Sequence, residues 1–362
     1  MKKNSIVEIR QTLVDELINY KGEPIKLNLS SEMLENILFD HQVYYDENKN
    51  KIVSKDFAYE LNNDYLPCDI IRKIDFTGVS FDGFNCSINF KGIKGVTINP
   101  QKMYKKDLSG AKFDGVTFEL DERGFDGIYL SDTSFKGARV KDGKPITINP
   151  QRLIYRNVAS CVFDGVIFNG TFDGTYIYGA DFTGSIGAYI NPQTVFEKNL
   201  DRTKLSNVCF FNNFNGVSVE GADFTGSINA FIDPQKLLNK SLVGTNLKDA
   251  HIINKNMDGV ILKDTNFTGV YGDVEVNPQK ICRRELKGCV LSGVNIIGPL
   301  DDCVLTETTF NGSNGAYVND IQTITYDGTT EFAGTVDMTN ALNEWKEKEN
   351  VERLIKKVVR NQ

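Results

Sequence analysis

The amino-acid sequence predicts an all-β solenoid in which short coils stack along one axis. Two nested repeats carry this prediction. The longer repeat, of 42 residues in most copies, is marked by a Pro-Gln step, and the shorter, of five residues, by large apolar side chains. A period of five fits neither an α-helix, at 3.6 residues per turn, nor a flat strand, at two. Self-similarity at fixed periods indicates that each repeat packs on its neighbours.

The longer repeat is visible in the proline of each Pro-Gln step. Successive prolines lie 50, 42, 42 and 44 residues apart, and Asp320 stands 42 residues after the last of them in a degenerate sixth copy. These prolines are Pro100, Pro150, Pro192, Pro234 and Pro278. The unit between Pro100 and Pro150 therefore contains extra residues.

The shorter repeat places a large apolar residue at every fifth position and a small residue two positions earlier. The fourth long unit gives the longest unbroken run of large residues: Ile232, Leu237, Leu242, Leu247, Ile252, Met257, Leu262 and Phe267. The small column contains Ala111, Cys161, Ala180, Thr203, Ala222, Thr245, Ala250, Thr265, Cys289 and Cys303. A chain that turns a corner every five residues would direct both columns inward.

Two segments, Ala180-Asp181-Phe182-Thr183-Gly184 and Ala222-Asp223-Phe224-Thr225-Gly226, contain the full five-residue unit. On these residues the sequence resembles the pentapeptide-repeat family, from about Ile74 to Phe332, as a variant with a double-coil unit that carries Asn-Pro-Gln. The resemblance implies a right-handed quadrilateral β-helix with four five-residue faces per coil and two coils per 42-residue unit.

Three regions are expected along the chain. Residues 1–70 form a partly helical N-terminal capping region, because Ile6 to Tyr20 and Glu32 to Phe39 have helical apolar spacing. Residues 71–336 form the β-helix. Residues 337–362 form an amphipathic helix with Trp345 and an apolar stripe from Val351 to Val359, and this helix is either a cap or a dimer contact.

The extra residues of the long unit form two insertions, a smaller one at Glu119-Leu120-Asp121 and a larger one from Val140 to Pro145. The second contains an Asp-Gly turn signal within Lys141, Asp142, Gly143 and Lys144. Surface loops tolerate insertion at small cost, so one interpretation is neutral drift. The other is a projecting contact element for a protein partner.

An eight-residue step recurs just before the Pro-Gln step, as Thr183 to Tyr189, Thr225 to Phe231 and Asn311 to Tyr317. Since it exceeds a five-residue face, we expect a bulge on every second coil. Tyr189, Phe231 and Tyr317 each precede an inward residue and should point outward, as candidates for protein binding. Alternatively, they pack on neighbouring bulges.

A basic residue stands six positions after each proline, at Lys106, Arg156, Lys198, Lys240 and Arg284. Stacked coils would align these residues into one column that could bind a polyanion. Polar and acidic neighbours such as Asp107 and Glu285 weaken the field of this column, which favours a solvated face instead.

The sequence offers little for catalysis, and we expect neither an enzyme, nor a cofactor, nor a metal. It has two histidines, His41 and His251, without a recurring motif around them, and seven cysteines without CxxC spacing. No stretch approaches the ~18 apolar residues of a spanning helix, and residues 1–20 do not resemble a signal peptide. A cytoplasmic location without membrane contact is therefore expected.

The leading functional hypothesis is a non-catalytic scaffold that binds an unidentified protein. The family resemblance implies a rival, a DNA mimic that modulates a type II topoisomerase such as gyrase, as in quinolone resistance. Mimicry requires an acidic surface, yet residues 71–336 hold 30 Asp and Glu against 27 Lys and Arg. A substrate-binding module of a bacterial effector is a third option. Direct nucleic-acid binding is not expected, and a homodimer through the C-terminal helix is an open alternative.

Overall fold

The computed structural model describes residues 15–26, 43–45, 51–53, 72–83 and 90–332. Its contacts divide the chain into two compact units. Unit 1 comprises Met1–Ile148 with Arg152–Ile154, and unit 2 comprises Asn149–Gln151 with Tyr155–Gln362. The boundaries expected from the sequence, near residues 70 and 336, are a different division and stay predictions.

The described residues form short strands and single turns of 3-10 helix. The strands are β1 (Ile25–Lys26), β2 (Val43–Tyr45), β3 (Lys51–Val53), β4 (Ile74–Asp75), β5 (Thr97–Ile98), β6 (Thr117–Phe118), β7 (Arg139–Val140), β8 (Ile146–Ile148), β9 (Val166–Phe168), β10 (Tyr189–Ile190), β11 (Cys209–Phe210), β12 (Phe231–Ile232), β13 (His251–Ile252), β14 (Val274–Val276) and β15 (Val294–Ile296). The 3-10 turns are η2 (Pro100–Lys102), η3 (Tyr104–Lys106), η4 (Pro150–Arg152), η5 (Ile154–Arg156), η6 (Phe196–Lys198), η7 (Pro234–Lys236), η8 (Leu238–Lys240), η9 (Cys282–Arg284) and η10 (Ile321–Thr323). Within the described ranges, no helix has the length and the apolar character needed to cross a membrane.

The described N-terminal part of unit 1 contains strands that the sequence did not predict. β1 pairs in parallel with β4, and β2 pairs with β3 as an antiparallel hairpin. Residues 15–17 are helical, and the Nζ of Lys73 donates hydrogen bonds to the carbonyl oxygens of Leu17 and Ile18, at 2.6 and 3.0 Å. The partly helical capping region over residues 1–70 stays a prediction. The segment Glu32 to Phe39 lies outside the described residues.

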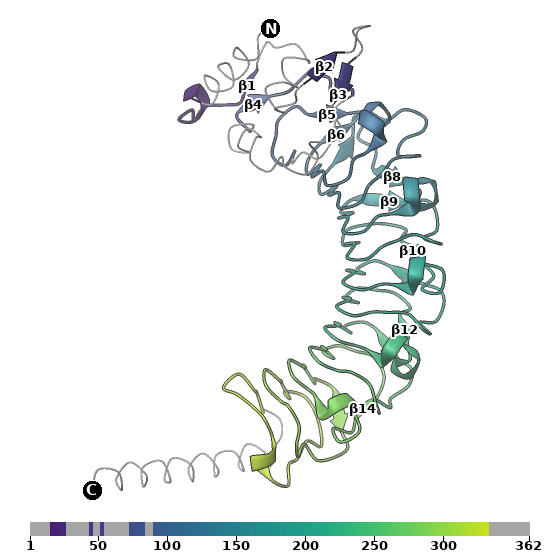
Figure 1. Cartoon of the computed structure of the whole chain (residues 1–362), viewed down its shortest axis with the longest axis vertical. Helices are drawn as coiled ribbons and strands as arrows, with labels where there is room; N and C mark the ends of the chain where they lie inside the picture. Colours follow the sequence, from purple (N-terminus) through teal and green to yellow (C-terminus); the bar gives the residue numbers. More distant parts are fainter. Residues whose placement is uncertain (1–14, 27–42, 46–50, 54–71, 84–89, 333–362) are drawn as a thin grey trace, which may run out of the picture. The chain divides into compact units, whose positions relative to one another are not determined.

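Parallel pairing dominates the remaining described chain. β5, β6 and β7 form one sheet in unit 1, while β10–β11, β12–β13 and β14–β15 are parallel pairs in unit 2. Isolated parallel bridges connect residues 18 to 24 positions apart, as Pro299 with Tyr317 and Asn266 with Val290. We call the stretch of chain between one bridged residue and its partner a coil. In unit 2 the coils follow one another in sequence order (Figure 1).

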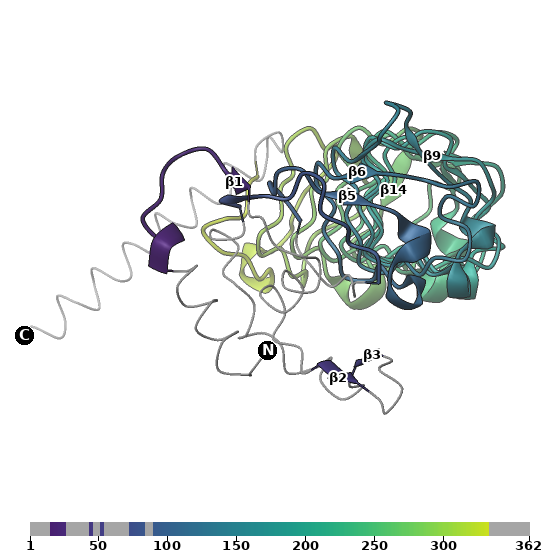
Figure 2. The ribbon, with the colours of Figure 1, turned by 90° about the horizontal axis from the view of Figure 1, so that it is seen from above.

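Bridged residues within one coil are five positions apart, as Asn199, Lys204 and Cys209 are. The five-residue period of the sequence is therefore the spacing between neighbouring columns of bridges. Seen from above, the coils of unit 2 from β9 to β14 overlie one another (Figure 2). Each column accordingly runs from coil to coil, with neighbouring backbones about 4.8 Å apart.

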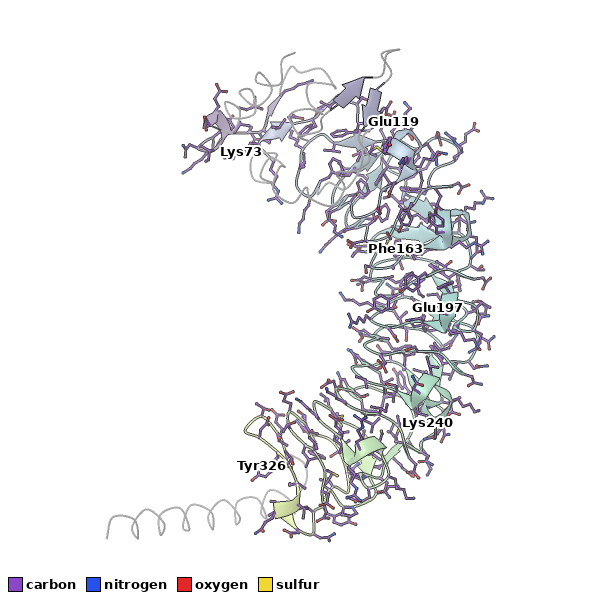
Figure 3. All side chains as sticks on the ribbon, in the orientation of Figure 1. Lys73, Glu119, Phe163, Glu197, Lys240 and Tyr326 are labelled. Carbon is purple, nitrogen blue, oxygen red and sulfur yellow. The ribbon has the colours of Figure 1, made fainter. Side chains whose placement is uncertain are left out.

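The predicted inward ladder is confirmed. All eight large residues from Ile232 to Phe267 are buried, with exposed fractions of 6% or less. All ten members of the small column are buried as well. Aromatic rings fill much of the interior: the rings of Phe210 and Phe214 have centroids 5.0 Å apart, and Phe163, labelled in Figure 3, packs on Phe182 at 5.5 Å.

The Pro-Gln step has a structural role between coils. Asn191 and its equivalents accept a hydrogen bond from the backbone N–H of the glutamine, which fixes the turn. The Nε2 of Gln235 then donates to the carbonyl oxygens of Asn256 and Asp258 in the next coil, at 3.0 and 2.8 Å. The same pair of bonds is made by Gln101, Gln151, Gln193 and Gln279. The recurring motif therefore joins adjacent coils.

Candidate protein-binding surface

One column of outward residues in unit 2 is continuous through the bulges. Ile186 pairs with Ile167 of the preceding coil, and three residues later Tyr189 pairs with Cys209 of the following coil. The column continues from Cys209 to Ile228, where the next bulge shifts it by three residues to Phe231. The bulge offsets the strand register but keeps the series of outward side chains intact.

The eight-residue step forms the bulge expected from the sequence. Besides the glycine of the preceding turn, each copy contains a second residue in the left-handed region: Gly187 at φ 73°, Asn229 at φ 59°, Gly272 at φ 102° and Gly315 at φ 75°. A Cβ at Gly187 would lie 2.8 Å from the carbonyl oxygen of Phe168 in the preceding coil. The chain therefore needs glycine there both for its backbone conformation and for the close approach.

A second outward column lies two residues further along the same strands. Side chains alternate between the two faces of a strand, so Ile253 points to the same side as His251 while Ile252 between them points inward. Ile253 is 61% exposed and Ile252 is 6% exposed. Phe211 stands in the same relation to Cys209.

On each of five successive coils, large apolar side chains occupy one of the two columns. They are between 44% and 61% exposed, and we call them the apolar strip: Ile186, Tyr189, Phe211, Ile228, Phe231, Ile253 and Tyr271. Isolated exposed apolar residues are common on folded proteins, but a contiguous series marks a contact surface. With four steps of about 4.8 Å between its first and last coils, the apolar strip extends for about 19 Å.

Aromatic rings stack on one another within the apolar strip. Phe231 and His251 are direct partners across β12 and β13, and their ring centroids lie 4.9 Å apart. His251 in turn stacks on Tyr271 of the next coil at 4.8 Å. The three rings form a ladder that holds their orientations, so part of this surface is ordered before any partner binds.

The apolar strip has little charge of its own. Neither outward column carries Lys, Arg or Glu between Ile186 and Tyr271, and its one carboxylate belongs to Asp233. The Asp233 side chain is nearly buried, and it accepts hydrogen bonds from Gln235 N–H and Asn254 Nδ2 at 3.1 and 3.0 Å. This carboxylate is therefore occupied by structural contacts, and the surface offers apolar contact area.

The three aromatic residues singled out from the sequence are all exposed, at 57% for Tyr189, 44% for Phe231 and 42% for Tyr317. In the first outward column, Tyr317 comes after the polar residues Asn295 and Asn314, which pair with each other on adjacent coils. Exposed Ile297 lies in the second column, two residues after Asn295. It therefore continues the apolar strip beyond a more polar stretch. Phe231 also packs on a neighbour, although this neighbour is His251 on a plain coil and not another bulge.

The insertion loop belongs to unit 1. β7 adds a third strand to the sheet of β5 and β6, and the chain then turns through Lys141, Asp142, Gly143 and Lys144, all exposed. Ion pairs tie the loop down: Lys141 Nζ lies 2.7 Å from Glu119 Oε1, and Lys144 Nζ lies 2.5 Å from Asp142 Oδ2. The hydrogen bond from Lys144 lowers the pKa of the Asp142 carboxyl. The loop is therefore exposed, and ion pairs hold two of its lysines.

Each residue of the basic column lies in the same turn of its 42-residue repeat. Two residues labelled in Figure 3, Glu197 in η6 and Lys240 in η8, belong to copies of this turn. All five members have left-handed backbone conformations, with φ between 47° and 54° at Lys106, Arg156, Lys198, Lys240 and Arg284. Three of them have structural partners. Lys198 and Lys240 donate to the glutamine Oε1 atoms of their own Pro-Gln steps at 3.0 and 2.8 Å, and Arg284 pairs with Asp302 at 2.9 Å.

The described titratable groups show few features of a catalytic site. Burial raises the pKa of the Cys289 and Cys303 thiols to about 12, so neither is a ready nucleophile. Among the residues that the structure describes, His, Cys, Asp and Glu form no group of three that could hold a metal ion.

Sequence reasoning missed most of the apolar strip. It identified Tyr189 and Phe231 but not Ile186, Ile228 or Tyr271. Ile186 and Ile228 lie three residues before Tyr189 and Phe231, outside the register of the inward ladder. A signal was present, because Ser-Ile-Gly-Ala-Tyr and Ser-Ile-Asn-Ala-Phe both carry an isoleucine three positions before the aromatic residue. The three-residue shift at the bulge, visible only in the pairing, places these residues in the same outward column.

Known proteins add little to this picture. No family model matches the chain, and no curated protein matches it either. Among solved structures, two trypsin-treated variants of QnrB1, a plasmid-mediated fluoroquinolone resistance protein, are 13% and 14% identical to this chain. Each match covers 64% of this chain and 90% or 92% of the other, at a TM-score of 0.18. A score this low carries no conclusion about fold or function.

Proposed function

We propose that this chain is a non-catalytic scaffold that binds a protein partner through the apolar strip of unit 2. The observation that carries the proposal is the strip itself: seven exposed apolar side chains on five successive coils. Aromatic residues are enriched at the centres of protein interfaces, where they combine large contact area with few rotatable bonds. Tyr189, Phe231 and Tyr271 would be the anchors of such an interface.

The architecture behind this function would be a right-handed, four-sided β-helix of the pentapeptide-repeat type. The five-residue spacing of the bridged columns and the inward ladder support four faces per coil. A regular stack suits a scaffold, since adjacent coils hold surface side chains at a fixed spacing along one face. The insertion loop at Lys141 to Lys144 would be a second contact element on unit 1.

DNA mimicry has less support from the described surface. A mimic needs rows of carboxylates free to meet a basic partner. Many carboxylates on these coils instead have basic partners, as Asp181 has Lys204 at 2.8 Å, Asp126 has Arg152 at 2.8 Å and Asp302 has Arg284 at 2.9 Å. The hydrogen-bonded column of Lys198 and Lys240 is likewise a weak candidate for a polyanion site.

The experiment is a comparative capture of partners from the source cells by three immobilised proteins, with quantitative mass spectrometry. The first is the parent, the second is Tyr189→Ala/Phe231→Ala, and the third is Phe196→Ala/Leu238→Ala. Phe196 and Leu238 are 48% and 46% exposed but lie outside the apolar strip, so they control for loss of apolar surface in general.

We expect a partner that is retained by the parent and by the control but lost from the strip variant. Its affinity for the purified strip variant should be weaker by about 2 kcal/mol or more if these residues are anchors. A partner bound equally by all three proteins, but lost when Lys106, Lys198 and Lys240 are replaced by Met, would move the site to the basic column.

A further inference from the structure

We propose that the C-terminal segment of this same chain, residues 343–362, docks along the apolar strip as an amphipathic helix. The segment lies outside the described residues, and its stripe of Trp345, Val351, Leu354, Ile355, Val358 and Val359 comes from the sequence alone. The inference concerns the surface used in the proposed function but needs no external partner. It therefore holds or fails separately.

A helix and the stacked coils have similar spacings along their axes. An α-helix advances about 5.4 Å per turn and presents one or two residues of its apolar stripe on each turn. Successive coils lie about 4.8 Å apart, and each coil of the apolar strip presents one or two large apolar side chains. A helix that lies parallel to the stacking axis would therefore set one turn against each coil.

The helical stripe and the apolar strip also match in length. The stripe from Trp345 to Val359 would extend for about 21 Å as a helix, at about 1.5 Å per residue. The apolar strip from Ile186 to Tyr271 extends for about 19 Å. The two apolar surfaces therefore have nearly the same length, with a mismatch of less than one helical turn.

The last bridged residue of the described chain lies in the column of bridges that precedes the apolar strip. Glu331 pairs with Thr309, in the column that also contains Val290 and Asn266. In each coil the outward column of the strip follows five residues later, as Tyr271 follows Asn266 and Asn314 follows Thr309. The chain therefore leaves its last bridged coil on the side that immediately precedes the apolar strip.

The connection is long enough to reach. The coil of Glu331 lies three steps beyond that of Tyr271, about 14 Å along the axis. The stretch from Phe332 to Trp345 covers about 20 Å if helical and up to about 43 Å if extended. A tethered segment within reach acts at an effective concentration in the millimolar range, which favours this chain's own segment over that of a second copy.

Charge is compatible with this arrangement. Residues 343–362 contain six Lys and Arg and four Glu, which lie between the apolar positions and would face solvent. The apolar strip itself presents no Lys or Arg that would repel them. If the segment is docked, an external partner must displace it, so the apparent affinity of that partner depends on the fraction of open chains.

The test uses Trp345, which is the single tryptophan of the chain. Its quenching by acrylamide is measured in the full chain, in the strip variant Ile228→Lys/Ile253→Lys and in the off-strip control Phe196→Lys/Leu238→Lys. We expect Trp345 to be protected in the parent and in the control. In the strip variant its quenching should rise to that of the free 343–362 peptide.

A second variant, Leu354→Lys, should release Trp345 without touching any coil, which guards against a fold defect in the strip variant. Protection in the parent should stay constant over a wide range of protein concentration, with the chain monomeric in sedimentation. The proposal is overturned if Trp345 is fully quenched in the parent, or if the strip variant leaves its protection intact, as a helix that caps the last coil would. It is also overturned if protection appears only as dimers form.

Discussion

The rings of Phe231 and His251 contact each other across β12 and β13 on the outer surface of two adjacent coils, with centroids 4.9 Å apart and an angle of 34° between the ring planes. The contact is possible because the bulge at Asn229 shifts the outward column by three residues without breaking it. Two residues twenty positions apart in the sequence thus become direct neighbours in the outward column that carries much of the apolar strip.

A double-mutant cycle on Phe231→Ala and His251→Ala measures this contact. We expect a coupling free energy of about 0.5 kcal/mol, as for other cross-strand aromatic pairs on a half-exposed face. The free energy of unfolding in urea gives the coupling. The control cycle pairs Phe231→Ala with Phe196→Ala, which lie outside contact, and should be additive. A coupling near zero in the first cycle would mean that the rings do not stack in solution.

The bulge glycine offers a matched pair of substitutions in unit 2. Gly187 and Gly165 both have left-handed backbones, with φ of 73° and 80°. A Cβ at Gly187 meets the carbonyl oxygen of Phe168, whereas a Cβ at Gly165 has no heavy atom within 4 Å. Gly165→Ala should cost about 1 kcal/mol through its backbone alone, and Gly187→Ala should cost clearly more because the bulge must shift. Thermal unfolding measures both, and equal losses would contradict the close approach at the bulge.

The glutamine of the Pro-Gln step should contribute to stability through its two donors. Gln235→Met keeps the side-chain length but leaves the carbonyl oxygens of Asn256 and Asp258 without their Nε2 partner. We expect a loss of about 1 to 3 kcal/mol in the free energy of unfolding. Lys240→Met removes only the bond to the glutamine oxygen and should cost less. If the two variants lose the same amount, the glutamine does not join the coils.

Much of the fold could be predicted from the sequence, because the five-residue period within a coil determines whether each residue points inward or outward. Large residues five apart and small residues two before them predicted the interior, and Leu247 and Ala222 are both fully buried. The N-terminal strands could not be predicted in this way. β1 has only two residues and pairs with β4, 49 positions away, so no local period marks it.

The candidate site could be predicted only in part. The register of the inward ladder identified Tyr189 and Phe231 as outward, but exposure alone does not show which outward residues share a face. That information is in the pairing of Ile186 with Ile167 and of Tyr271 with His251. The basic column illustrates the opposite case, since its repetition in sequence suggested binding while Lys240 is engaged by Gln235.

The reactivity of the cysteines tests which side chains point into the coils and which point to solvent. Burial raises the pKa of Cys289 and Cys303 to about 12, so at pH 8 only on the order of one thiol in ten thousand is ionised. Cys209 lies on the outer side of β11 and is partly exposed. We expect iodoacetamide to alkylate Cys209 in the native protein and to spare Cys289 and Cys303 up to about pH 9. Peptide mapping gives the sites, and native labelling of Cys289 would contradict its burial.

The most direct test of the coil arrangement compares Ile252→Asp with Ile253→Asp. The two isoleucines are adjacent, yet Ile252 is 6% exposed inside the coils and Ile253 is 61% exposed on the apolar strip. Ile252→Asp should bury an unpaired carboxylate and lower the free energy of unfolding by about 3 kcal/mol or more. Ile253→Asp should cost less than about 1 kcal/mol, as surface changes do. Equal losses, or a larger loss for Ile253→Asp, would contradict the register from which both the interior and the apolar strip are derived.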